Sequence, residues 1–183
     1  MTYTSHGKGR GRPYGRRGSA AGLVLALLLV FVAIHFQLLP APWATADDPT
    51  TATVVRVIDG DTLEVTIAGA NARVRLLAID APETGESPDC YGPEATRHLA
   101  QLLDQGSTIR LVTDPTQPAT DEYGRMLAYV ELDGDDIGQA MLAAGMARSW
   151  LGTPPAQRYL KYLATEGRSR ASRHGLWLAC THR

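Results

Sequence analysis

Short apolar, β-branched runs separated by tight turns open the main part of the chain. The first two runs cover residues 54–58 and 63–67 and enclose the turn Asp59-Gly60-Asp61. A third run covers residues 74–79 and ends at Asp80-Ala81-Pro82-Glu83. Runs rich in valine and isoleucine, bounded by Asp, Gly and Pro, are typical of β-strands. The pattern predicts two strands joined by a tight turn, then a third strand that ends at an acidic turn.

Helical periodicity follows Gly92-Pro93. Ala95, Leu99 and the leucines after them recur at helical spacing and predict a helix over residues 93–105. Residues 108–112 and 127–132 return to a strand pattern. Five short strands with helices inserted and appended, rather than strictly alternating, predict an α+β fold that is mainly a β barrel: a five-stranded OB-fold barrel with about three helices.

Two more helices complete the expected fold. Residues 137–144 predict a short helix that Gly145 ends. The last helix is expected over residues 155–172, because proline is favoured in the first turn of a helix. Its inward face is expected to carry Leu160, Leu163, Ala164 and Ala171.

The first 46 residues have a different character. Their five basic residues all precede the stretch 18–46, which contains no Asp, Glu, Lys or Arg. A basic flank before an apolar segment is typical of an export signal and predicts an N-terminal hydrophobic helix. Two alternatives stay open: cleavage after Ala46, which releases a secreted protein, or an uncleaved membrane anchor. We therefore expect residues 1–46 to form a leader and linker, and residues 47–183 to form one extracytoplasmic domain.

The expected domain is acidic. Residues 47–183 carry 13 Lys and Arg against 19 Asp and Glu, which gives −6 where the whole chain has −1. Proteins that bind nucleic acids tightly and non-specifically usually have a basic surface. The charge therefore favours a catalyst that meets phosphate locally. Arginines do gather after position 147, where they either form a solvated helix face or attract a polyanion.

Cys90 and Cys180 are the two cysteines of the chain. Outside the cytoplasm such a pair usually forms a disulfide, which would tie the C-terminus to the loop after Glu83. Two unpaired thiols are the alternative.

Three acids and two arginines supply the groups needed to break a phosphodiester. Asp61 and Asp80 offer carboxylates for a hard cation, Glu83 could activate or position water, and Arg75 and Arg125 could hold a phosphate. Each has an ordinary explanation by itself. Arg75 interrupts an apolar strand, for example, and would simply face solvent unless carboxylates or phosphate balance its charge inside the barrel.

Four segments resemble the signature blocks of the staphylococcal nuclease (thermonuclease) family, in the same order and with similar spacing. They are residues 57–62, 74–84, 91–95 and 121–129, and the resemblance extends over about residues 51–177. It implies an OB-fold, calcium-dependent nuclease that acts on DNA and RNA and leaves 3′-phosphate ends.

The resemblance also implies a role for individual residues. Asp61, Asp80 and the main-chain carbonyl of Ala81 match the Ca²⁺ ligands, and Asp59 matches an acid near the metal. Glu83 matches the acid that contacts the attacking water. Arg75 and Arg125 match the two phosphate-binding arginines. Tyr123 is a candidate for contact with a base or a terminal phosphate, whereas Trp150 is expected mainly to pack in the core.

Two features depart from the family pattern. The loop between Glu83 and Tyr91 is short and lacks lysine, and Glu122 stands where a basic residue often precedes the tyrosine. Both suggest weaker attraction of the substrate. We expect a monomeric nuclease with a nucleic-acid substrate. The alternatives are a non-catalytic OB-fold module that binds nucleic acid at the cell envelope, and a structural envelope domain anchored by the N-terminal helix.

Overall fold

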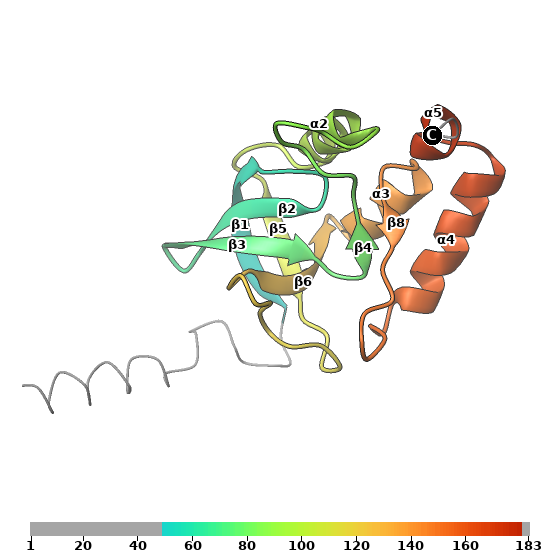
Figure 1. Ribbon diagram of the computed structural model, residues 1–183. Coiled ribbons are helices and arrows are strands. Elements are labelled where there is room, and N and C mark those ends of the chain that lie inside the picture. Colours follow the sequence, from blue (N-terminus) through green and yellow to red (C-terminus); the bar gives the residue numbers. More distant parts are fainter. Residues whose placement is uncertain (1–48, 181–183) are drawn as a thin grey trace, which may run out of the picture. The chain divides into compact units, whose positions relative to one another are not determined.

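Five strands close into a barrel in the computed structural model, which describes residues 49–180 (Figure 1). The strands are β1 (Thr50–Val57), β2 (Thr62–Ile67), β3 (Ala70–Leu76), β5 (Thr108–Val112) and β6 (Met126–Leu132). They lie antiparallel in the order β3-β2-β1-β5-β6, and parallel pairing of β3 with β6 closes the barrel. The predicted α+β fold with a five-stranded OB-type barrel is confirmed.

Apolar side chains fill the barrel because alternate residues of each strand point inward. Those with no more than 2% of their surface exposed include Val54, Leu63, Val65, Val74, Leu76, Ile109, Leu111, Met126, Ala128 and Val130. Two shorter strands, β4 (Ile79–Asp80) and β8 (Arg148–Ser149), form a separate antiparallel pair outside the barrel. Another short strand, β7 (Asp135–Asp136), extends the sheet of the barrel beyond β6.

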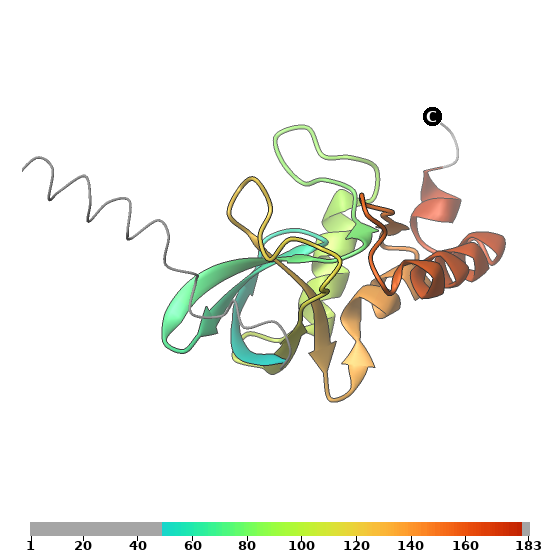
Figure 2. The same cartoon turned by 90° about the horizontal axis from the view of Figure 1, so that it is seen from below.

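The helices are α2 (Gly92–Leu102), α3 (Ile137–Ala143), α4 (Tyr159–Ala171) and the short α5 (Leu176–Ala179). The first two lie close to their predicted ranges. Helix α3 contacts both β6 and α4, so it lies between the barrel and α4 (Figures 1 and 2). No helix within residues 49–180 is long and apolar enough to span a membrane. The expected N-terminal hydrophobic helix falls outside the described residues.

The prediction for α4 is wrong in two respects. The helix begins at Tyr159 rather than at residue 155, because tertiary partners bind the backbone before it. The Pro154 carbonyl accepts a hydrogen bond from Gln117 (2.6 Å), and the Gln157 N–H donates to Asp114 (2.6 Å).

The inward face of α4 also differs from the expected one. Leu160 and Leu163 are 75% and 44% exposed, and Ala164 and Ala171 are exposed as well. The buried residues are instead Tyr162, Thr165 and Ser169. The Tyr162 hydroxyl donates to Asp136 (2.6 Å) beside α3, so hydrogen bonds rather than leucines set the rotation of α4.

Asp114 fastens the loop before α4 to the barrel. Its carboxylate accepts hydrogen bonds from the Tyr129 hydroxyl (2.6 Å), the Gln157 N–H and both polar groups of Thr116. Burial alone would raise the pKa of Asp114, but these hydrogen bonds hold it below its ordinary value. The folded protein therefore favours the ionised carboxylate.

We predict that Asp114→Ala lowers the free energy of unfolding by about 3 kcal/mol at neutral pH, because it leaves the buried Tyr129 hydroxyl and the Gln157 N–H without their acceptor. Since the folded pKa is the lower one, this stabilisation is present above the unfolded pKa and is lost as pH falls through the folded value. Urea unfolding at neutral and acidic pH measures both effects. The exposed Asp104→Ala is the control, and equal losses for the two variants would contradict the prediction.

Candidate active site

The turn between β1 and β2 directs Asp61 into the protein. Asp59 stabilises the turn by accepting a hydrogen bond from the Asp61 N–H (3.0 Å). A Cβ atom at Gly60 would lie only 2.6 Å from the Cβ of Ala81 and 2.9 Å from that of Ala95. The position therefore requires glycine, because the turn packs directly against α2 and the segment after β4.

Asp61 is a buried carboxylate surrounded by donors. Only 4% of its surface is exposed. One oxygen accepts the Ala81 N–H (2.8 Å), and the other accepts the Thr62 hydroxyl (3.0 Å). Burial raises the pKa of Asp61 to about 7, although Arg75 and the Ala81 N–H act in the opposite direction. A cation at this carboxylate would therefore supply charge compensation that the fold supplies only in part.

Arg75 joins the two carboxylates proposed as metal ligands. Its Nη2 lies 3.1 Å from Asp61 Oδ2 and 3.0 Å from Asp80 Oδ1. Its Nη1 donates to the carbonyls of Leu76 (3.0 Å) and Ile79 (2.7 Å). The side chain is only 16% exposed. Arg75 therefore does not face solvent as an ordinary strand arginine, and its charge is balanced by carboxylates and backbone.

Arg125 reaches the same network from the loop before β6. Its Nε donates to Asp121 (2.7 Å), and its Nη1 lies 3.4 Å from the hydroxyl of Thr62, which in turn donates to Asp61. The guanidinium also lies over the ring of Tyr123, 5.4 Å from its centre. Two hydrogen bonds and an ion pair thus connect Arg125 through Thr62 and Asp61 to Arg75.

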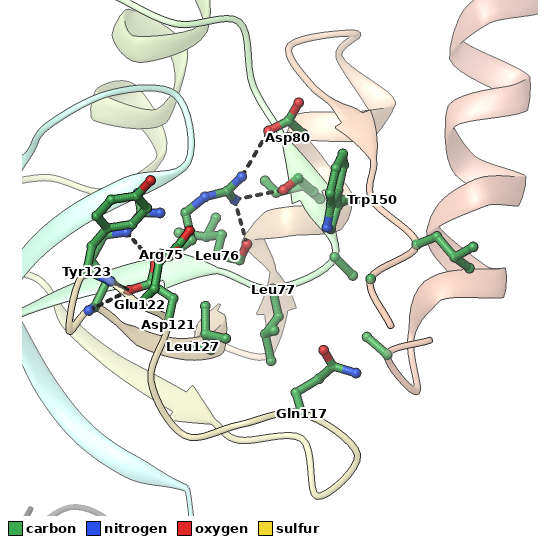
Figure 3. Close-up of a pocket in the computed structure, with 16 residues that line it drawn as sticks. Arg75, Leu76, Leu77, Asp80, Gln117, Asp121, Glu122, Tyr123, Leu127 and Trp150 are labelled. Carbon is green, nitrogen blue, oxygen red and sulfur yellow. Dashed lines mark hydrogen bonds and ion pairs between the residues drawn. The ribbon is translucent and has the colours of Figure 1, made fainter. Parts of the chain in front are cut away.

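A cavity of about 320 Å³ opens beside this network. Figure 3 shows Arg75 and Asp80 on one side of it, with Tyr123 and Trp150 at its margins. Tyr123 is 76% exposed, and Trp150 is 59% exposed. The expectation that Trp150 packs mainly in the core is wrong, because the backbone pairing of Trp150 N–H with Ala78 (2.8 Å) leaves its indole at the surface.

Glu83 lies on the other side of Asp80, with an exposed side chain and a fixed backbone. Its carbonyl accepts the Asp89 N–H (3.0 Å), and its N–H lies 3.3 Å from the carboxylate of Asp89. Gly92 packs so closely on the Glu83 carbonyl that any side chain there would clash. Glu83 lines a second cavity of about 330 Å³, and Asp80 lines both cavities.

A disulfide between Cys90 and Cys180 closes the far side of this second cavity. It connects the end of α5 to the residue that follows Asp89. Because Asp89 holds the backbone of Glu83, the disulfide tethers the segment that presents the Glu83 carboxylate. The pair suggested by the sequence is therefore bonded in the structure.

The donor atoms suit a hard cation. Asp61 and Asp80 each place an oxygen against the same nitrogen of Arg75, so two carboxylates converge, and the backbone of Ala81 lies against one of them. Within residues 49–180 no group of three or more acidic, histidine or cysteine side chains could hold a metal. Ca²⁺ accepts carboxylate, carbonyl and water oxygens in irregular geometry, so such a sparse set of ligands fits it.

The residues predicted from sequence lie near one another in the structure. Arg75 contacts both Asp61 and Asp80, Arg125 is linked to Asp61 through Thr62, and Glu83 lines a cavity together with Asp80. Sequence reasoning missed two connecting residues, Thr62 and Asp121. Both lie inside the segments that resemble the family's signature blocks, close to residues that the sequence singled out, but nothing in their own residue type marks them.

Comparison with known proteins gives consistent matches. The family described as "Staphylococcal nuclease homologue" matches residues 73–179. The chain is 33% identical over 129 residues to the "SPbeta prophage-derived endonuclease YokF" of Bacillus subtilis, covering 68% of this chain and 43% of that protein. It is 33% identical over 129 residues to "Endonuclease YncB" of the same organism, covering 68% and 60%. It is 34% identical over 135 residues to a "Micrococcal nuclease" of Shigella flexneri, covering 68% and 71%. The chain thus spans about half the length of the first two relatives.

We predict that removing the disulfide with Cys90→Ser and Cys180→Ser lowers the free energy of unfolding by about 4 kcal/mol, as expected in the chain-entropy picture for a loop of this size. The bridge joins residues 90 positions apart. Guanidinium unfolding measures the change. Dithiothreitol should destabilise the wild type by a similar amount and leave the double variant unchanged. A wild type that takes up the alkylating reagent on both cysteines under denaturing conditions without prior reduction would contradict the prediction.

Proposed function

This chain belongs to the staphylococcal nuclease homologue family, and from its site we propose that it is a nuclease that hydrolyses phosphodiester bonds of DNA, RNA or both. The supporting observation is the contact of one half-buried guanidinium, Arg75, with both Asp61 and Asp80. Nothing in barrel stability requires two carboxylates and an arginine to gather at the end of β3. Such a cluster does suit the binding of a cation and a phosphate side by side.

We propose Ca²⁺ as the metal, held by the carboxylates of Asp61 and Asp80 and the main-chain carbonyl of Ala81. When bound, it would supply Lewis-acid stabilisation of negative charge on the phosphate. Few protein ligands contribute, so binding should be weak and suited to the calcium concentrations found outside cells. Asp59 acts indirectly, because it shapes the turn that presents Asp61.

Each side chain has a separate role in the proposed reaction. Glu83 accepts a hydrogen bond from the attacking water and takes up its proton as the water oxygen bonds to phosphorus. Arg75 and Arg125 donate to the non-bridging oxygens, on which charge accumulates. The bond from phosphorus to the 5′-oxygen then breaks, the 5′-oxygen takes a proton from solvent, and the phosphate stays on the 3′-carbon. Tyr123, exposed beside Arg125, contacts a base or a terminal phosphate.

We further propose that the protein works as a monomer outside the cytoplasm, secreted or held at the membrane by its N-terminal segment. The basic and apolar residues of positions 1–46 support this proposal. The Cys90–Cys180 disulfide also supports it, because disulfides persist mainly in oxidising compartments. Sequencing the N-terminus of the mature protein from fractionated cells separates secretion from anchoring.

Cleavage is expected to depend on calcium. We predict that the protein cuts single-stranded DNA in millimolar Ca²⁺, that a chelator abolishes cutting, and that added Ca²⁺ restores it. Gel electrophoresis follows cleavage, and mass spectrometry of the fragments should find 3′-phosphate ends. Equal cleavage with and without chelator would reject this mechanism, whereas binding without cleavage in calcium would favour the non-catalytic module.

We predict that Arg125→Ala and Glu83→Gln each lower kcat by about 10² to 10³-fold, as for other groups that stabilise developing charge or move a proton. Both side chains lie at the site without belonging to the barrel core, so the melting temperature should change little. Arg110→Ala, on the outer surface of β5, is the control. A loss of activity no greater than that of the control would contradict the assigned roles.

A further inference from the structure

Arg148 lies directly opposite Asp80 in the small sheet of β4 and β8. Residues opposed in an antiparallel pair project from the same face, so Arg148 and Asp80 extend toward the same region. Asp80 is engaged by Arg75. Within the described part of the chain, Arg148 itself makes no ion pair or side-chain hydrogen bond with any residue. Its charge is therefore available to an outside anion.

The position of Arg148 is nevertheless fixed. Its guanidinium stacks over the indole of Trp177, 4.5 Å from the ring, and Trp177 is only 9% exposed. The backbone next to it is held on α4, because Glu166 accepts the Ser149 N–H (2.8 Å) and the Ser149 hydroxyl. A stacked arginine on a fixed strand loses little further freedom when its planar guanidinium binds a phosphate group.

A second arginine strengthens the positive charge at this place. The guanidinium of Arg170 lies over the same indole, 5.2 Å from the ring. Both guanidiniums lie against the same ring, so the two positive charges are near each other. Neither is paired with a carboxylate within residues 49–180. Two neighbouring cations repel each other unless an anion lies near them. In a domain of net charge −6, this is a local basic site.

The basic site borders the proposed chemistry. Arg148 lines the second cavity together with Asp80, Ala81 and Glu83. Arg75 and Arg125 line the first cavity, and Asp80 is common to both. A strand whose reacting phosphate lies at Arg75 and Arg125 therefore meets another arginine in the second cavity, which Asp80 and Glu83 also line.

We propose that Arg148 binds the phosphate of a nucleotide next to the cleaved bond, and so makes the enzyme selective for polynucleotide chains over isolated phosphodiesters. This inference rests on the proposed nuclease function and deepens it. Arg148 acts by positioning the chain and takes no part in bond cleavage. Its contribution should thus appear in KM for substrates with several phosphates, and not in kcat.

The test compares Arg148→Gln with wild type on a single-stranded oligonucleotide and on a dinucleoside monophosphate, which has a single phosphate. For the oligonucleotide, KM should rise about tenfold, the effect of losing one partly exposed charge-assisted contact. Kinetics on the dinucleoside monophosphate should not change. Arg173→Gln removes the same charge from an exposed position that lines neither cavity and should behave as wild type.

Salt dependence gives a readout that does not need cleavage. In chelator, the slope of log K against log salt for oligonucleotide binding should decrease in magnitude by about 0.7 for Arg148→Gln, the value for one phosphate contact on a single strand. Arg148→Lys keeps the charge and should retain most of the slope, even if loss of stacking on Trp177 lowers the melting temperature.

The possible failures are distinguishable. A wild type that cleaves neither substrate refutes the proposed function, and the salt slope then still decides whether Arg148 contacts phosphate. A wild type that cleaves both, with Arg148→Gln unchanged in KM and in slope, refutes only the inference. Equal KM increases on both substrates would also overturn it, because they would assign Arg148 to the cleaved phosphate or to the fold.

Discussion

The contact of Arg75 with Asp61 and Asp80 is the interaction on which the site depends. It joins the turn after β1, the end of β3 and the strand β4 through a single guanidinium. Two carboxylates this close would repel each other without a cation between them. Arg75 supplies this positive charge from within the protein. Its further hydrogen bonds to two backbone carbonyls fix the position of the guanidinium. The barrel thus positions the acids before any ligand binds.

This arrangement links the stability of the fold to its proposed chemistry. Asp61 is buried, which raises its pKa, and the donors around it are those that favour a charged carboxylate. A cation bound there would add its positive charge to that of Arg75 and further stabilise the ionised carboxylate of Asp61. The guanidinium would then share its donors among carboxylates and phosphate. Such competition among few charged groups at short range would let an acidic domain bind a polyanion, as the proposed function requires.

The sequence predicted the barrel well because its strands alternate and its turns contain Asp, Gly and Pro where the chain must bend. It also singled out the residues of the candidate site, but only because their order and spacing match a family. Considered alone, Arg75 was equally consistent with an exposed strand position. The helix α4 shows the limit of periodicity. Its leucines suggested one buried face, whereas Tyr162 and Thr165 form the buried one, because hydrogen bonds to partners distant in sequence set the rotation.

The arrangement of the arginines indicates how the proposed nuclease would recognise its substrate. The excess of acids disfavours attraction by a broad basic surface, so in the proposed function the few arginines beside the cavities would do most of the phosphate binding. Contacts with acidic side chains fix the positions of Arg75 and Arg125. Both arginines could be identified because they lie in segments that resemble the family's signature blocks. The indole of Trp177 fixes the position of Arg148. Because Trp177 is distant in sequence, no local sequence pattern marks Arg148. In the proposed complex, ion pairs would fix the arginine that meets the cleaved phosphate, and stacking on Trp177 would fix the arginine that meets the rest of the strand.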